Sequence, residues 1–138
     1  MQAPEDFFHS ARLGNISDVE KHLDQGVHKD SQDDEYGSTA LMWASDNGHE
    51  AVCELLITRG CNVDMQNKDG WTALMYASYS YHGKIPVAIS LIEAGCDYSL
   101  RNEEGKSAMD YLRKDYHDNV EEAQVSRSPS AVVTHSLI

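Results

Sequence analysis

Histidine and cysteine are the side chains of this sequence best suited to bind a metal or to act in catalysis, so their spacing is considered first. Neither a His-Glu-x-x-His motif nor a pair four residues apart occurs among the seven histidines, His9, His22, His28, His49, His82, His117 and His135. The three cysteines, Cys53, Cys61 and Cys96, are an odd set without Cys-x-x-Cys spacing, which argues against a disulfide framework and a zinc site. No Gly-x-Ser-x-Gly motif or glycine-rich phosphate loop is present. The sequence therefore predicts no enzyme, no metal site and no cofactor.

An internal repeat predicts the elements that must position any functional side chain. The segment Gly37–Ser45 recurs 33 residues later as Gly70–Ser78, and again in weaker form at 105–112. A second segment, 55–64, matches 90–99 at an offset of 35 residues. Self-similarity at periods of roughly 20–50 residues is typical of stacked repeats, in which neighbouring units share one continuous core.

These repeated segments resemble the ankyrin repeat. The residues that carry the resemblance are Thr39-Ala40-Leu41-Met42, Ala44-Ser45, Asn47-Gly48-His49, Leu55-Leu56 and Gly60-Cys61-Asn62. The resemblance covers about residues 5–125. It implies an all-α fold, a solenoid of stacked helix-turn-helix units with projecting β-hairpin-like fingers, and a role in binding other proteins.

The same resemblance implies an ankyrin-repeat domain over residues 1–125, and the change in composition after Val125, to Ser126-Arg127-Ser128-Pro129-Ser130, predicts a flexible tail over 126–138. Its units are expected at about 4–33, 34–66 and 67–101, followed by a degenerate capping unit at 102–125 with a polar outer side.

Several positions have expected structural roles within a unit. Thr39 and Thr72 stand where a helix N-cap belongs. Met42 and Met75 replace the family's usual histidine and are expected to fill the same inward space with apolar bulk. Among the cysteines, Cys61 and Cys96 are expected in the core, and Cys53 is expected to be partly exposed.

Aromatic residues occupy the positions that face the concave groove in ankyrin-like units. The groove positions implied by the resemblance are Tyr36, Trp43, Asp69, Trp71, Tyr76, Lys106 and Tyr111. Trp and Tyr are favoured at binding hot spots because they combine a large, stiff contact area with a polar group. The alternative is that Trp43 and Tyr76 simply pack against the next unit.

A two-residue insertion, Ser78–His82 in place of Ser45–Asn47, adds Tyr79 and Tyr81 to the third unit. It is interpreted either as a further part of the binding surface or as drift in a tolerant loop.

The charge of the chain indicates the kind of partner. Asp and Glu number 23 against 11 Lys and Arg, which gives a formal net charge of -12. Acidic residues are predicted to rim the groove, namely Asp33, Asp34, Glu35, Asp46, Asp69, Glu103 and Glu104. This balance argues against nucleic acid and favours a protein segment with basic residues and one or two apolar anchors. No apolar stretch approaches the roughly 20 residues that a membrane span requires, and an intracellular, cytoplasmic rather than nuclear, location is expected.

The favoured function is therefore a non-catalytic adaptor or inhibitor that binds a partner protein through groove and fingers. One alternative is a two-ended scaffold, because Ser136, Leu137 and Ile138 resemble the C-terminal ligand of a PDZ domain. Another is a fragment of a larger ankyrin-repeat protein.

The PDZ hypothesis makes a direct prediction if Ile138 is the natural C-terminus. Adding one glycine after Ile138 should abolish capture by immobilised PDZ domains, because backbone amides must hold the terminal carboxylate. Capture that survives the added residue would refute the hypothesis.

Overall fold

The structure of the chain is a computed structural model that describes residues 3–79 and 84–112. Its helices are α1 (Glu5–Leu13), α2 (Ile16–Asp24), α3 (Ala40–Asp46), α4 (Glu50–Thr58), α5 (Ala73–Tyr79) and α6 (Ile85–Glu93). A further helical segment occupies 108–112. The part of the chain that the structure describes contains no sheet, only an isolated antiparallel bridge between Gln32 and Thr39. The predicted all-α class is confirmed.

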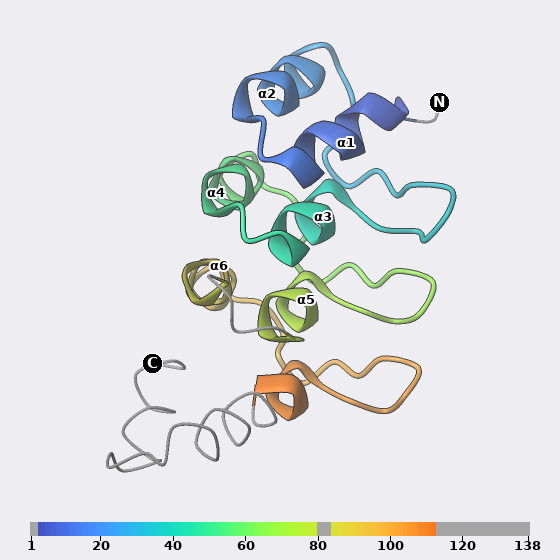
Figure 1. Cartoon of the computed structure of the whole chain (residues 1–138), viewed down its shortest axis with the longest axis vertical. Coiled ribbons are helices and arrows are strands. Elements are labelled where there is room, and N and C mark those ends of the chain that lie inside the picture. The colour runs from blue at the N-terminus through green and yellow to red at the C-terminus, as the bar shows by residue number, and fades with distance from the viewer. Residues whose placement is uncertain (1–2, 80–83, 113–138) are drawn as a thin grey trace.

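The helices form stacked pairs. Figure 1 shows α1, α3 and α5 in one column, α2, α4 and α6 in a second column, and three long loops that extend sideways from the stack. Within the first column α3 packs against both α1 and α5, and within the second α4 packs against both α2 and α6. This is the repeat solenoid that the self-similarity of the sequence predicts.

Hydroxyl caps begin two helices of the first column. The side-chain oxygens of Thr39 and Thr72 each accept a hydrogen bond from the backbone N–H three residues later, at 3.2 Å, which confirms the predicted caps.

The turn between α1 and α2 depends on Gly14, at φ 77°, where an added Cβ would lie 2.6 Å from Nδ1 of His49. His49 can pack so closely because glycine stands there, and its Nε2 makes a 2.8 Å hydrogen bond with the carbonyl of Arg12.

The core runs between the two columns. Its largest fully buried side chains include Phe7, Met42, Leu56, Met75 and Leu91, so the prediction that the two methionines fill inward space is confirmed.

The expectation for Cys53 was wrong. Its side chain is fully buried on the same side of α4 as Val52 and Leu56, and its sulfur lies 3.6 Å from Oγ of Ser45. Cys96 is buried, as predicted, and Cys61 is half-buried.

Hydrogen bonds join each loop to the next at nearly the repeat period. The N–H of Lys68 donates to the carbonyl of Tyr36, and the N–H of Glu103 donates to the carbonyl of Asp69, each at 3.0 Å. At the base of the loops, the N–H of Asn62 donates to Oδ1 of Asp30 at 2.7 Å, a bond repeated between Asp97 and Asp64. The loops are therefore fastened to one another through groups that neighbouring units supply.

The predicted unit boundaries remain predictions, because the capping unit is described only as far as residue 112. Tyr81 and the tail residues Ser136, Leu137 and Ile138 lie outside the described residues.

Truncating a buried leucine should destabilise the fold far more than truncating an exposed one. Leu56→Ala should lower the free energy of unfolding by about 2–5 kcal/mol, because Leu56 is fully buried between helices. The matched change Leu13→Ala, at a side chain 60% exposed, should cost within about 0.5 kcal/mol in the same urea titration. Equal losses at the two positions would contradict the described packing.

Candidate protein-binding face

The candidate site is the side of the solenoid formed by α1, α3, α5 and the loops that follow each helix pair. We call it the groove face and define it by Tyr36, Trp43, Trp71, Tyr76 and Tyr79. Tyr36 and Tyr79 are exposed to 46% and 56%, and the other three are half-buried. None of these five rings is withdrawn into the core.

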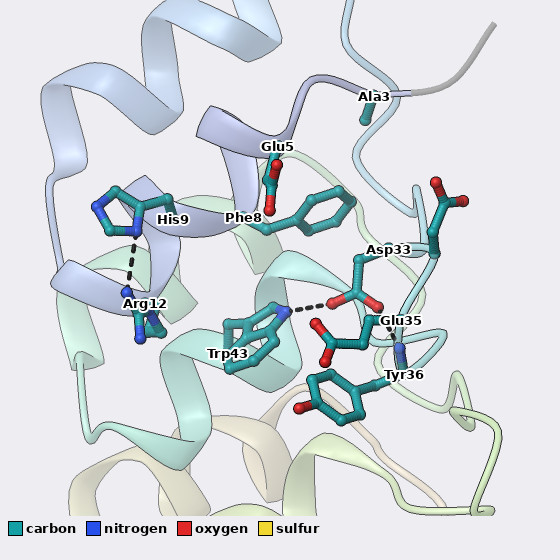
Figure 2. Close-up of a pocket in the computed structure, with 10 residues that line it drawn as sticks. Ala3, Glu5, Phe8, His9, Arg12, Asp33, Glu35, Tyr36 and Trp43 are labelled. Carbon is teal, nitrogen blue, oxygen red and sulfur yellow. Dashed lines mark hydrogen bonds between the residues drawn. The ribbon is translucent and has the colours of Figure 1, made fainter.

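The first hollow on this face lies between α1 and the first long loop. It has a volume of about 690 Å³ and is lined by Ala3, Glu5, Phe8, His9, Arg12, Asp33, Asp34, Glu35, Tyr36 and Trp43. Figure 2 shows the rings of Phe8, Trp43 and Tyr36 around it, with carboxylates of Glu5, Asp33 and Glu35 between them. The hollow therefore combines aromatic surfaces with negative charge.

The second hollow lies between α3 and α5, and it shares Tyr36 and Trp43 with the first. It has a volume of about 260 Å³ and is lined by Tyr36, Ser38, Met42, Trp43, Asp46 and Tyr76. Its lining is mainly aromatic and thioether, so it suits an apolar side chain.

Asp33 positions both rings that separate the hollows. Its Oδ1 accepts hydrogen bonds from the backbone N–H groups of Tyr36, at 2.8 Å, and Ser38, at 3.2 Å. Its Oδ2 accepts from the indole N–H of Trp43 at 2.8 Å. The rings of Tyr36 and Trp43 then meet edge to face, with centroids 5.9 Å apart.

The same device recurs in the next two units with an amide in place of the carboxylate. Asn67 accepts two backbone N–H groups through Oδ1 and donates from Nδ2 to the hydroxyl of Tyr76 at 2.8 Å. Asn102 likewise binds two backbone N–H groups and donates to the hydroxyl of Tyr111 at 2.7 Å. An indole N–H needs an acceptor, whereas a phenol can accept from an amide, which explains why Asp33 accompanies Trp43 and Asn accompanies Tyr.

A tight aromatic cluster continues the face beyond the second hollow. The ring of Trp71 lies 4.9 Å from Tyr76, 5.5 Å from Tyr79 and 4.8 Å from Tyr111, measured between centroids. Tyr111 is only 6% exposed, so it supports this cluster from beneath rather than presenting its own surface.

The three remaining predicted charges have different surroundings. Asp46 lies 3.4 Å from the ammonium group of Lys84, whereas Asp69 is exposed. Lys106 pairs with Glu104 at 3.4 Å and lies over the ring of Tyr111.

The sequence interpretation missed Lys84. This lysine is nearly buried, and its Nζ lies 3.3 Å from the carbonyl of Tyr76 as well as near Asp46. It occupies the repeat position of His49, just before the second helix of its unit, so a position-by-position comparison of the repeats could have identified it.

Burial shifts the pKa of all three cysteine thiols. Burial raises the pKa of Cys53 and Cys96 to about 11 and that of Cys61 to about 12, so the thiols stay protonated at neutral pH. Hydrogen bonding to Glu35 raises the pKa of Tyr36, and burial raises that of Tyr76. In residues 3–79 and 84–112, no three His, Cys, Asp or Glu side chains are placed to hold a metal ion. None of the helices in these two ranges combines the length and apolar composition needed to cross a bilayer.

Comparison with known proteins agrees with the architecture. A family model described as ankyrin repeats (3 copies) matches residues 7–102. The chain is 46% identical over 57 residues to human ankyrin repeat domain-containing protein 39; the matched stretch covers 41% of this chain and 31% of that protein. It is 34% identical over 79 residues to mouse ankyrin repeat and SAM domain-containing protein 6, covering 56% of this chain and 9% of that protein. It is 36% identical over 64 residues to human scaffold protein ILK, covering 46% and 14%. The matches thus span less than a third of each relative.

Replacing the Asp33–Trp43 pair by the Asn–Tyr pair found in the other units tests whether the two partners are matched through their hydrogen bond. Asp33→Asn should destabilise the fold by about 1–3 kcal/mol, because the amide turns an N–H toward the indole N–H of Trp43. Adding Trp43→Tyr should recover part of that loss, measured as a coupling energy of about 0.5–3 kcal/mol in a double-mutant cycle by urea unfolding. Strictly additive effects would contradict the assigned pairing.

Proposed function

The chain belongs to the ankyrin-repeat family, a family of protein–protein interaction modules, and we propose that it binds a partner protein through the groove face without catalysing a reaction. In this proposal it acts as an adaptor or an inhibitor, requires no cofactor or metal, and keeps the intracellular location expected from the sequence.

The observation that carries the proposal is the aromatic surface of the groove face. Tyr36 and Tyr79 are among the exposed large hydrophobic side chains, and Trp43, Trp71 and Tyr76 are only half-buried beside them. Exposed apolar patches of this kind mark interaction sites, and Trp and Tyr contribute heavily to binding energy. The rings also contact one another, and the polar groups of Trp43 and Tyr76 are held by hydrogen bonds, so less side-chain entropy is lost when a partner binds.

The chemistry of the face favours a partner segment that is both basic and apolar. The hollow of about 260 Å³ between Tyr36, Met42 and Tyr76 accommodates an apolar anchor. The carboxylates around the first hollow, together with the net charge of -12, attract cations and speed encounter with a basic segment. The same charge disfavours nucleic acid.

One alternative has a specific observation in its favour. The matches cover between 9% and 31% of the three relatives, whose names include a SAM-domain protein and a scaffold protein. The repeats can therefore be one part of a larger protein, in which they would still supply the binding surface. The PDZ-ligand alternative stays a prediction from the sequence.

The proposal is tested by removing exposed rings from the groove face. The protein is immobilised, partners are captured from an extract of its own cells, and affinity for the main captured protein is measured by biolayer interferometry. Tyr36→Ala with Tyr79→Ala should weaken that affinity by about 10- to 100-fold, the range expected for hot-spot aromatics.

Tyr98→Ala provides a matched control. Tyr98 is 59% exposed in the turn that follows α6 and is not among the residues that line either hollow. Its truncation should leave affinity unchanged. If the Tyr36/Tyr79 variant stays folded and binds as well as the Tyr98 variant, the groove face is not the binding site.

A further inference from the structure

The carboxylates that line the first hollow differ in the hydrogen bonds and ion pairs that they already make within the protein. Asp33 has both oxygens engaged by backbone and indole N–H groups. Within the described residues, by contrast, neither an ion pair nor a side-chain hydrogen bond involves the carboxylates of Glu5 and Asp34. Glu35 interacts with the hydroxyl of Tyr36 alone. Three carboxylates thus line one hollow, and no cationic side chain of residues 3–79 or 84–112 forms an ion pair with any of them.

Nearby positive charge only partly offsets this acidity. Arg12 lines the hollow, but its guanidinium lies 3.0 Å from Nδ1 of His9. Lys68 donates its Nζ hydrogens to the main-chain carbonyls of Asp34 and Glu35, 3.2 Å from the latter, and not to their carboxylates. Four acidic side chains stand against two basic groups, and the hollow keeps a net negative charge.

The aromatic rings beside the carboxylates favour a guanidinium over an ammonium group as the cation that binds in the hollow. The indole N–H of Trp43 is held by Asp33, which fixes the ring, and Figure 2 shows the Tyr36 ring and the Glu35 carboxylate beside it. A guanidinium is planar and weakly hydrated, so it can lie against an aromatic face while its edge donates to carboxylates. A lysine ammonium is a more strongly hydrated point charge and lacks this dual fit.

We propose that the first hollow is a side-chain pocket for an arginine of the partner segment. The guanidinium packs against Trp43 and Tyr36 and donates hydrogen bonds to the carboxylate of Glu35, while Asp34, which also lines the hollow, adds negative charge. The volume of about 690 Å³ leaves space for the neighbouring partner backbone. Because Tyr36 and Trp43 also line the second hollow, the arginine stands next to the apolar anchor in the bound segment.

This inference rests on the proposed function, since it assigns one anchor of the partner to one pocket, but a small probe can test it separately. The chain has two tryptophans, so the intact protein gives two indole N–H signals in a ¹H–¹⁵N spectrum. Trp43 reports on the pocket, and Trp71, in the following unit, is an internal reference. The probe is Nα-acetyl-arginine amide, titrated beside the corresponding citrulline compound, its neutral isostere, and the lysine compound.

The arginine probe should shift the Trp43 indole signal saturably and leave Trp71 nearly unmoved. The citrulline probe should bind about tenfold more weakly, because it lacks the positive charge. The lysine probe should bind about threefold more weakly, because it lacks the planar guanidinium group. Equal binding of arginine and citrulline, or absence of a saturable shift, overturns the proposal.

A pair of charge-matched variants tests the position of the pocket. Asp34→Asn with Glu35→Gln should weaken arginine binding about fivefold, because it removes the Glu35 acceptor and a neighbouring negative charge from the hollow. Glu103→Gln with Glu104→Gln makes the same change in net charge on another loop and should have almost no effect. Equal weakening by both pairs would mean diffuse attraction and would overturn the pocket.

The two proposals fail in distinguishable ways. If the arginine probe does not bind but the Tyr36/Tyr79 variant loses its partner, the pocket is refuted and the groove face stands. If the probe binds at Trp43 but the same variant retains its partner, the hollow binds arginine, but the groove-face function fails and with it the assignment of that arginine to the partner.

Discussion

Each structural unit of this chain depends on its neighbour to complete its hydrogen bonds as well as its core. A long loop with few regular backbone bonds has many polar groups to satisfy, and leaving them unpaired is costly. Here the groups that satisfy one loop come from the next loop, as when the N–H of Lys68 meets the carbonyl of Tyr36 and that of Asn62 meets Asp30. Stacking therefore holds the loops as well as burying the helices, and the groove face is formed before any partner arrives.

Within that frame a single side chain in each unit connects the loop to the groove. Asp33, Asn67 and Asn102 each fold their own loop through two backbone N–H groups and then fix one aromatic residue on the next helix. The aromatic surface is thus oriented by the same atoms that shape the loops. Rigid rings with anchored polar groups make good binding surfaces because ordering them on association costs little entropy.

Sequence reasoning reached the fold because periodicity and capping are local signals. The recurrence of Gly37–Ser45, the caps at Thr39 and Thr72, and the inward methionines all depend on residues close along the chain. Features that depend on packing between helices were not predicted. Cys53 was expected to be partly exposed, because its burial requires the packing of α4 on α3. The ion pair of Lys84 with Asp46 joins residues 38 positions apart in neighbouring units. The hollows likewise form only between units.

The most direct measurement is amide hydrogen exchange in the loops of the intact protein. Lys68 and Glu103 are exposed, yet their N–H groups donate to the preceding loop; Asp34 and Glu35 make no backbone N–H hydrogen bond among the described residues. If the units fasten one another as described, Lys68 and Glu103 exchange at least about 100-fold more slowly than Asp34 and Glu35, at rates that follow unfolding of the stack. Exchange of all four amides at the rate of an unstructured peptide would show loops that move independently and would contradict a preformed groove face.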